Sequence, residues 1–340
     1  MDSAVCSARK STTKPKIVER QFTASMKIVQ AFVLGAGLGT RLRPLTNDLP
    51  KPLVPIFQKP LITFAFDHLI AFGIRKFIVN THHLPERFAE QFPDSRYRDI
   101  PIQFVHEPVR LETGGGIKNI EHLLGGDAFI TYSGDVLTDV DLRPLVREHF
   151  QRGNDVTLGL RQTGLGSSIS LQDDGRVVIE QKGKAAGESC DFANIAVWNP
   201  TIFSQIPPNE HIGFIPVLVD WIAAGGRIGG VIMPDGSWFN IGSREQYLAL
   251  HRTIAASRWA PSFVPDRDWT NPIGSNAQID PTTELRGCSV VGRDCRVEAG
   301  AVLEDTILWP GAQIASRTEL IGCIVRCKKT ASGKHRNIDI

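Results

Sequence analysis

Apolar residues recur at every sixth position near the end of this 340-residue chain, and this repeat restricts its fold more than any other feature. Gly, Asn, Asp and Ala are frequent between the apolar positions, as expected for turns. Such hexapeptide repeats are typical of parallel β-helices, in which each coil buries its apolar residues against the next coil. We predict a short left-handed parallel β-helix of about three coils over residues 273–327. The residues in this register are Ile273, Ile279, Leu285, Val291, Val297, Leu303, Trp309, Ala315 and Ile321.

Strand-like and helix-like segments alternate in the part of the chain before the repeat. KIVQAFVL, RKFIVNTHH, IPIQFVHE and DAFITYSGD are strand-like, and amphipathic or apolar helix-like segments separate them. This alternation predicts a Rossmann-like α/β domain over residues 26–256, with a mostly parallel sheet covered on both faces. Sites in such sheets form where the carboxyl ends of the strands meet. Shorter strand-like runs over residues 154–198 predict a subdomain that covers the substrate.

The remaining segments carry weaker signals. Residues 1–25 contain no apolar region of a secretory signal, so we expect a disordered extension, with translation starting at Met1 or Met26. Residues 257–272 are expected to form a linker, and residues 328–340 a flexible tail. The formal charge of +2 is too small to indicate nucleic-acid binding. No apolar run approaches the roughly 20 residues of a membrane span. We therefore expect a cytoplasmic protein without nucleic-acid or membrane partners.

The glycine-rich segment GAGLGTRLRPLTNDLPKPLVPI, residues 35–56, follows the first strand-like run. It lacks the glycine spacing of a dinucleotide-binding fingerprint and the Gly-Lys-Ser/Thr ending of a P-loop, and its prolines interrupt the helix that both require. Glycines at alternate positions allow backbone N–H groups to approach a triphosphate. Arg41 can offer a planar fork to phosphate oxygens, and the surrounding prolines stiffen the segment that carries Lys51.

These residues, together with LETGGGI, SGD, IEQK and WFNIG, resemble the sugar-1-phosphate nucleotidyltransferases over residues 27–256. Many members of that family also carry a hexapeptide tail. The resemblance implies an Mg²⁺-dependent reaction in which an NTP and a sugar 1-phosphate give an NDP-sugar and pyrophosphate. LETGGGI followed by SGDVLTD is most similar to N-acetylmuramate-1-phosphate uridylyltransferases and to mannose or heptose guanylyltransferases, which favours UTP or GTP and a role in cell-envelope or polysaccharide precursor synthesis.

The resemblance also implies roles for individual residues. Arg41 would bind the β- and γ-phosphates, Lys51 would neutralise the phosphates at the transfer centre, and Lys182 would bind the sugar phosphate. Asp135 would bind the metal ion. The nucleotide would lie against Leu34, Gly35, Gly37, Gly39, Thr40, Arg41, Glu112 and Gly114, and the sugar phosphate against Gly115, Glu180, Lys182 and Asn194.

The second metal ligand departs from the usual family pattern. Asn240 stands where an aspartate is common, and a neutral amide oxygen binds Mg²⁺ more weakly than a carboxylate does. Related uridylyltransferases use an Asp/Asn pair, so an active enzyme remains the main interpretation. The departure keeps open a catalytically weak regulatory paralogue that only binds nucleotide sugars. Choline-phosphate-type cytidylyltransferase chemistry is a further alternative, disfavoured by IEQK.

The predicted β-helix raises the question of a second activity. Acyltransferase sites in such coils need a histidine base, and no His occurs between residues 252 and 334. We therefore expect the β-helix to cap the catalytic domain and to form a homo-oligomer.

Overall fold

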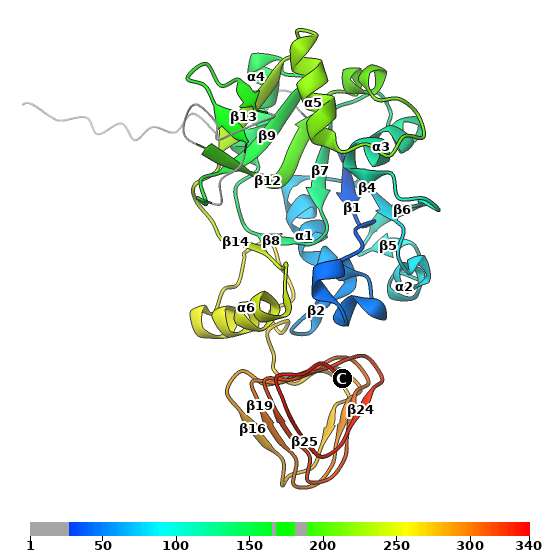
Figure 1. Ribbon diagram of the computed structural model, residues 1–340, viewed down its shortest axis with the longest axis vertical. Coiled ribbons are helices and arrows are strands. Elements are labelled where there is room, and N and C mark those ends of the chain that lie inside the picture. Colours follow the sequence, from blue (N-terminus) through cyan, green and yellow to red (C-terminus); the bar gives the residue numbers. More distant parts are fainter. Residues whose placement is uncertain (1–26, 165–167, 181–188) are drawn as a thin grey trace, which may run out of the picture.

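The computed structural model describes residues 27–164, 168–180 and 189–340. An α/β domain and a triangular coiled domain lie one above the other (Figure 1). The predicted extension over residues 1–25 falls outside the described residues. Among those that are described, no helix is long and apolar enough to cross a membrane.

Four parallel strands form the centre of the α/β domain, in the order β6-β4-β1-β7. They are β1 (Gln30–Leu34), β4 (Lys76–Thr81), β6 (Ile100–His106) and β7 (Phe129–Ser133). The long strand β12 (Ser189–Trp198) continues the sheet in antiparallel direction beside β7. The predicted mixed, mostly parallel Rossmann-like sheet is confirmed.

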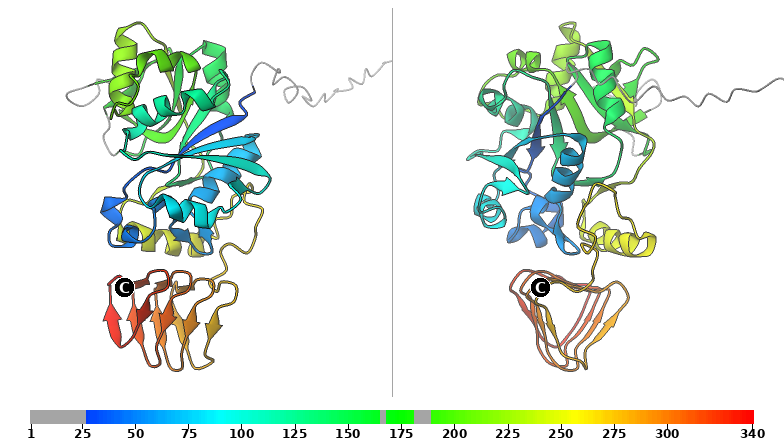
Figure 2. Two further views of the ribbon diagram at one scale, coloured as in Figure 1. Left: turned by 90° about the vertical axis from the view of Figure 1, so that its right-hand side faces the viewer. Right: turned by 180° about the vertical axis from the view of Figure 1, so that it is seen from behind.

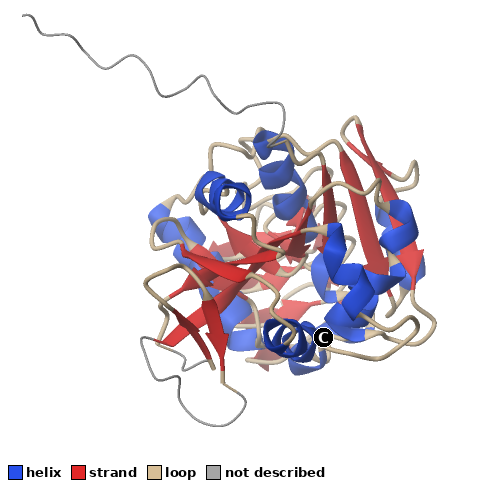
Figure 3. Ribbon diagram, turned by 90° about the horizontal axis from the view of Figure 1, so that it is seen from above, coloured by secondary structure: helices blue, strands red, loops and turns tan. Residues whose placement is uncertain are grey.

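Helices cover both faces of this sheet (Figure 3). Because neighbouring residues of a strand point to opposite faces, Val33 of β1 enters one hydrophobic core and Phe32 enters the other. The covering helices are α1 (Ile62–Phe72), α2 (Pro85–Gln91), α3 (Glu112–Asn119), α4 (Arg143–Arg152) and α5 (Phe214–Ala223). Gly73 ends α1 with φ of 124°, a conformation that a side chain would strain.

The remaining strands of the α/β domain extend or flank the sheet. They are β2 (Pro55–Ile56), β3 (Lys59–Pro60), β5 (Arg96–Tyr97), β8 (Val136–Thr138), β9 (Val156–Arg161), β10 (Ile169–Leu171), β11 (Val177–Ile179), β13 (Ile228–Ile232) and β14 (Trp238–Asn240). Strand β14 pairs only with β8, beyond the carboxyl end of β7. This small ribbon leads the chain back to the edge where the central strands end.

The C-terminal part stacks short parallel strands into three sheets, as expected for a left-handed parallel β-helix (Figure 2). One sheet contains β15 (Gln278–Ile279), β18 (Arg296–Val297), β21 (Gln313–Ile314) and β24 (Thr330–Ala331). The second contains β16 (Glu284–Arg286), β19 (Val302–Glu304), β22 (Glu319–Ile321) and β25 (Lys334–Arg336). The third contains β17 (Val290–Val291), β20 (Ile307–Leu308) and β23 (Ile324–Val325).

The register of the repeat differs from the predicted one after Leu303. Leu308 pairs with Val291, and Ile314 pairs with Val297. The inner row therefore passes from Leu303 to Leu308, and this step is one residue shorter than the repeat of six. Trp309, Ala315 and Ile321 therefore do not continue the inner row, which passes through Leu308, Ile314 and Leu320. The sequence could not reveal the slip because both registers place apolar residues at nearly every position.

The predicted boundaries of the last segments are also wrong. Residues 328–340 are not a flexible tail, because β24 and β25 add a further turn to the stack. Arg244 holds this turn in place through Asp339, at 2.6 Å. The predicted linker over residues 257–272 is packed, since Trp269 is buried against Phe64 of α1.

Helix α6 (Arg244–Ser257) joins the two domains (Figure 1). Ser243 caps it by accepting a hydrogen bond from the Gln246 N–H. The buried Tyr247 hydroxyl donates to the carbonyl of Pro55 at 2.6 Å and accepts from Trp309 Nε1 at 3.0 Å. One side chain thus links the glycine-rich segment, the helix and the β-helix.

The corrected register can be tested on two neighbouring residues. Leu320 is fully buried, whereas Ile321 is half-buried. Leu320→Ala should lower the free energy of unfolding by about 2–5 kcal/mol, because it opens a cavity in the inner row. Ile321→Ala, the matched control, should cost below about 1 kcal/mol. Chemical denaturation of the full chain measures both changes in the free energy of unfolding. A larger loss for Ile321→Ala would contradict the corrected register and support the uninterrupted six-residue interval.

Three histidines are buried as neutral rings. Desolvation by burial lowers the pKa of His68, His149 and His251 from 6.5 to about 4. The contacts of His251 also require a neutral ring. Its Nε2 accepts from the Phe57 N–H, and its Nδ1 faces the carbonyl of Tyr247. A second proton on this ring would break the bond to Phe57.

Stability should therefore decrease on mild acidification. The unfolded chain protonates these rings near their ordinary pKa, while the folded chain does so only near pH 4. The free energy of unfolding should fall between pH 7 and pH 5 by on the order of 2 kcal/mol per histidine. His68→Phe, which keeps a ring stacked on Phe263, should reduce this slope. An unchanged unfolding midpoint over that pH range would contradict the account.

Candidate active site

A pocket of about 430 Å³ opens where the central parallel strands end. Residues at or just after the carboxyl ends of all four strands line it: Leu34 ends β1, Asn80 lies in β4, Glu107 follows β6 and Ser133 ends β7. The glycine-rich segment crosses its floor. The complete lining is Leu34, Ala36, Gly37, Leu38, Gly39, Thr40, Arg41, Leu42, Lys51, Pro52, Asn80, Glu107, Arg110, Glu112, Thr113, Ser133, Asp135, Ile241 and Gly242.

The three glycines of the segment serve different purposes. A Cβ at Gly35 would lie 2.6 Å from the carbonyl oxygen of Asn80, so this glycine permits close backbone packing. Gly37 faces open space inside the pocket, and a Cβ there would meet nothing within 4 Å. Gly39 adopts φ of 61° and starts the short 3₁₀ helix that carries Arg41. Only Gly37 and Gly39 line the pocket, and the Gly35 N–H donates instead to Asn80 Oδ1 at 2.8 Å.

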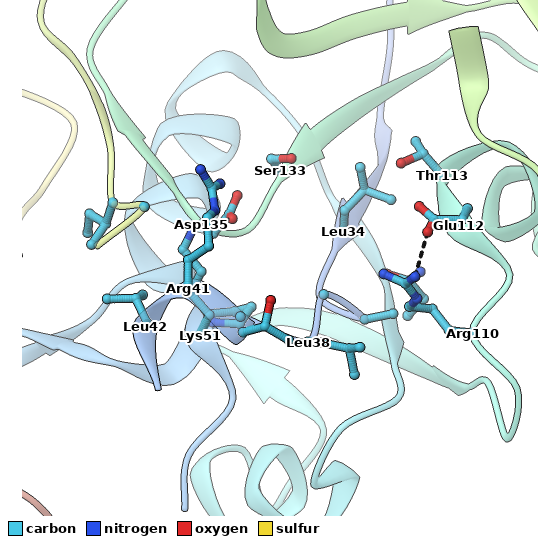
Figure 4. Close-up of a pocket in the computed structure, with 18 of the residues that line it drawn as sticks. Leu34, Leu38, Arg41, Leu42, Lys51, Arg110, Glu112, Thr113, Ser133 and Asp135 are labelled. Carbon is cyan, nitrogen blue, oxygen red and sulfur yellow. Dashed lines mark hydrogen bonds and ion pairs between the residues drawn. The ribbon is translucent and has the colours of Figure 1, made fainter. Parts of the chain in front are cut away.

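Arg41, Lys51 and Asp135 lie at one end of the pocket (Figure 4). Lys51 Nζ contacts Asp135 Oδ2 at 2.6 Å, although the two residues are far apart in sequence. The Lys51 side chain is 8% exposed and that of Asp135 is 34% exposed. Arg41 is exposed to the pocket and forms no ion pair with any described residue. This end of the pocket therefore offers two cationic groups and one accessible carboxylate.

Asn240 lies next to this group without lining the pocket. Strand β14 pairs with β8 so that Asn240 is opposite Val136, the neighbour of Asp135. Ile241 and Gly242, the residues that follow, do line the pocket. The structure thus brings the two predicted metal ligands together, from segments more than one hundred residues apart.

The opposite end of the pocket contains Arg110, Glu112 and Thr113 (Figure 4). Arg110 Nη2 pairs with Glu112 Oε1 at 2.6 Å, and the backbone of Glu112 has φ of 60°. His211 also approaches Glu112, at 3.4 Å. The Glu112 carboxylate, which the resemblance assigns to nucleotide binding, is therefore paired with Arg110 and also lies close to the His211 ring.

The glycines after Glu112 lie inside a helix. Helix α3 begins at Glu112 itself and contains all three of them. Gly114 and Gly115 are buried, and a Cβ on either would come within 3 Å of backbone carbonyl oxygens of Ile212 or Glu210. They allow α3 to pack closely on that segment and do not line the pocket.

The other predicted sugar-phosphate ligands lie beyond the pocket lining. Asn194 has φ of 63° at an irregularity in β12. It precedes Ile195, which pairs with Tyr132, so it lies beside the end of β7. Glu180 follows β11 and is half-buried. Lys182 lies outside the described residues.

Sequence reasoning missed a buried pair that supports both ends of the pocket. Asn80 Nδ2 donates to Glu107 Oε1 at 2.8 Å, and Glu107 Oε2 accepts from the Leu111 N–H at 3.1 Å. Both side chains are almost completely buried. Their position at the ends of strand-like runs was the available signal, because polar residues there face the site in parallel sheets.

The two histidines after β4 support the same region from outside the pocket. His82 Nδ1 lies 2.7 Å from the carbonyl of Glu107, and His83 Nε2 lies 2.7 Å from the carbonyl of Thr46. The Thr46 hydroxyl in turn donates to the carbonyl of Gly39. These contacts give both histidines a structural role.

This arrangement suits a polyanionic ligand. Because Gly37 has no side chain, its backbone leaves room for phosphate groups, and Arg41 and Lys51 provide positive charge beside it. No group of three or more His, Cys, Asp or Glu residues in the described ranges could hold a metal ion by itself. Asp135 and Asn240 offer a carboxylate and an amide oxygen, which are ligand types that Mg²⁺ accepts, usually together with water and substrate phosphates.

Comparisons with known proteins identify the family of this chain. The family model described as "Nucleotidyl transferase" matches residues 30–257. A mannose-1-phosphate guanylyltransferase of Mycobacterium tuberculosis is 32% identical over 87% of this chain and 83% of its own length. An N-acetylmuramate alpha-1-phosphate uridylyltransferase of Caulobacter vibrioides is also 32% identical, over 66% of this chain and 96% of its own length.

A solved structure supports the fold. HddC from Yersinia pseudotuberculosis superposes with a TM-score of 0.55 at 21% identity, covering 65% of this chain and 97% of that chain. The predicted resemblance to sugar-1-phosphate nucleotidyltransferases is confirmed by the family model and by these relatives. The chain belongs to the nucleotidyl transferase family.

Proposed function

We propose that this protein transfers a nucleotidyl group from an NTP to a sugar 1-phosphate and releases pyrophosphate. The observation that carries the proposal is the Lys51–Asp135 pair beside Arg41 and the open backbone of Gly37, all in one pocket. Relatives named for this kind of reaction are similar over most of the chain, which supports it.

The reaction needs charge neutralisation more than proton transfer. The phosphate oxygen of a sugar 1-phosphate is already a nucleophile, so no general base is required. The barrier is the approach of this anion to the α-phosphate of a triphosphate, and fixed cations lower it by positioning and electrostatic stabilisation. Arg41 would hold the leaving pyrophosphate, and Lys51 would neutralise the α-phosphate. Lys182, Glu180 and Asn194 remain the proposed partners of the sugar phosphate.

We further propose that Asp135 and Asn240 hold Mg²⁺ when substrates bind. The strand register, which places Asn240 opposite Val136 and so next to Asp135 along the chain, and the 34% exposure of the Asp135 side chain support this role. The bound cation would offset the negative charge of the phosphates during the transfer. Lys51, now paired with Asp135, would then be free to contact the phosphates that share the metal ion.

The proposed reaction leaves open which NTP and which sugar 1-phosphate are the substrates. GTP or UTP remain the favoured nucleotides, with a role in polysaccharide or cell-envelope precursor synthesis. GTP with mannose 1-phosphate is the first pair to test, because the guanylyltransferase relative is similar over both domains, whereas the uridylyltransferase relative covers 66% of the chain. A homo-oligomer through the β-helix stays a proposal, supported by the exposed Ile273 and Leu285 near its first coil.

Two alternatives have specific tests. A regulatory paralogue, suggested by Asn240, would bind nucleotide sugar without turning over any NTP. A choline-phosphate-type cytidylyltransferase would accept choline phosphate in place of a sugar 1-phosphate. A panel of five NTPs with several sugar 1-phosphates and choline phosphate, read as pyrophosphate release, separates all three functions.

Two arginines in the same loop provide a matched test of the site. Arg41 lines the pocket, whereas the exposed Arg43 does not. Arg41→Ala and Lys51→Ala should each lower kcat/KM by about 100-fold or more, because each removes a charge from the transition state. Arg43→Ala should change it by less than about threefold. Equal losses at Arg41 and Arg43, or near-normal pyrophosphate release by Lys51→Ala, would reject the assignment.

The metal proposal predicts opposite effects at its two ligands. Asp135→Asn should abolish turnover, because it leaves no carboxylate for the cation. Asn240→Asp should lower the Mg²⁺ concentration needed for half-maximal rate by about tenfold, because it adds a charged ligand. Initial rates across an Mg²⁺ titration measure both effects. Full activity in excess EDTA would contradict the metal site.

A further inference from the structure

A second pocket, of about 370 Å³, lies at the junction between the catalytic domain and the β-helix. Three parts of the chain form it: the end of the glycine-rich segment, helix α2, and corners of successive β-helix coils. We call it the junction pocket. Its lining residues are Asp48, Leu49, Leu53, Pro55, Phe57, Gln58, Pro60, Arg87, Glu90, Gln91, Arg293, Pro310, Cys327, Lys328 and Lys329.

The junction pocket carries an excess of unpaired positive charge. Its two carboxylates are already neutralised, since Asp48 pairs with Arg326 at 2.5 Å and Glu90 pairs with Arg87 at 2.8 Å. Arg293, Lys328 and Lys329 are exposed and form no ion pair with any residue in the described ranges. Three such cations around a concave site favour an anion, and phosphate oxygens suit both arginine and lysine.

The corner that presents these cations is built from stacked coils. The Gly311 N–H donates to the carbonyl of Arg293, and the Lys328 N–H donates to the carbonyl of Pro310. Lys328 has φ of 58°, which is uncommon for a residue other than glycine. These backbone hydrogen bonds place the main chain of Arg293, Pro310 and Lys328 on successive coils along one edge of the pocket.

The rest of the lining is apolar. Leu49, Leu53, Phe57 and Pro310 provide a surface that could cover the carbon skeleton of a small molecule. The volume lies in the range of small-molecule sites, which combine an apolar wall with a few polar groups. The matching ligand chemistry is a small organic molecule that carries at least one phosphate group.

The junction pocket shares a structural element with the active site. Lys51, Pro52 and Leu53 form one short 3₁₀ helix. Lys51 and Pro52 line the active-site pocket, whereas Leu53 lines the junction pocket. A ligand that contacts Leu53 can therefore shift the short helix that positions the Lys51 ammonium.

Arg326 provides a second connection between the β-helix and the catalytic loop. Its Nη1 contacts Asp48 Oδ2 and also donates to the carbonyl of Pro44 at 3.3 Å. These contacts fix the chain between Arg41 and Lys51 to the β-helix. An anion beside Arg293 and Lys328 would change the field around this ion pair without touching the substrates.

We propose that the junction pocket binds a small phosphorylated metabolite and that its occupancy shifts the segment carrying Lys51, which regulates the enzyme. The binding claim stands independently of the proposed reaction, whereas the regulatory claim rests on it. Lys328, Lys329 and Arg293 bind the phosphate group, and the apolar wall contacts the rest of the ligand.

Calorimetric titration of the full chain tests the binding claim. The probes are glucose 6-phosphate, which has no phosphate at C1 and so is not a sugar 1-phosphate, and inorganic phosphate alone. At least one should bind, and tighter binding of glucose 6-phosphate would identify the organic ligand rather than free phosphate. Arg293→Ala/Lys329→Ala should weaken the Kd about tenfold or more. Arg336→Ala, an exposed β-helix cation outside the pocket, and Lys51→Ala should leave it unchanged.

Two results would overturn the binding claim. One is the absence of heat up to about 10 mM of either probe. The other is binding that Lys51→Ala abolishes and the double variant leaves unchanged, because this places the anion in the active site.

Initial rates test the regulatory claim. Saturation with the bound probe should change kcat/KM of the wild type by about threefold or more. The Arg293→Ala/Lys329→Ala variant should keep its basal rate and lose this response, and Arg326→Ala should bind the probe with a smaller response. An unchanged wild-type rate at saturation would reject regulation. A wild type that binds the probe but never releases pyrophosphate would instead contradict the proposed reaction.

Discussion

The buried amide of Asn80 joins the carboxyl ends of three neighbouring strands. It lies in β4, accepts from the N–H of Gly35 after β1, and donates to the carboxylate of Glu107 after β6. Glu107 then accepts from the N–H of Leu111, which precedes the pocket-lining residue Glu112. Because a buried polar group without a partner is costly, this chain of hydrogen bonds requires the glycine-rich segment and the start of α3 to keep one relative position. The pocket between them depends on it.

The glycine-rich segment is held equally firmly from its other end. Tyr247 and His251 of α6 bond to Pro55 and Phe57, and Arg326 of the β-helix bonds to Pro44 and Asp48. The short helix with Lys51 lies between these anchors, with one side toward each pocket. The β-helix is therefore a part of the support of the catalytic loop as well as a separate stack of coils.

The sequence was sufficient for the features that depend on local pattern. Alternating strand-like and helix-like runs predicted the sheet, and the six-residue interval predicted the coils. Lys51, Arg41 and Asp135 were placed in one site by resemblance, and the structure brings them together.

The features that escaped the sequence depend on tertiary packing. The register slip at Leu308 leaves apolar residues in both possible rows, so only the pairing with Val291 distinguishes them. The resemblance assigned Gly114 and Gly115 to ligand contacts. In the structure they pack against backbone carbonyls of residues 210–212, which leave no space for a side chain. Asn80 and Glu107 gave no local signal of their partnership, which arises because β4 and β6 are neighbours in the sheet.

The proposed reaction transfers the nucleotidyl group, which is the nucleoside with its α-phosphate, directly from a bound triphosphate to a sugar 1-phosphate, and the β- and γ-phosphates leave as pyrophosphate. The most direct measurement follows isotopic label from GTP or UTP, placed separately in the α- and γ-phosphates, in the presence of Mg²⁺ and mannose 1-phosphate. We predict that α-label appears only in the nucleotide sugar and γ-label only in pyrophosphate, with no label on the protein. Transfer of γ-label to the sugar, or α-label retained covalently on the chain, would contradict the account.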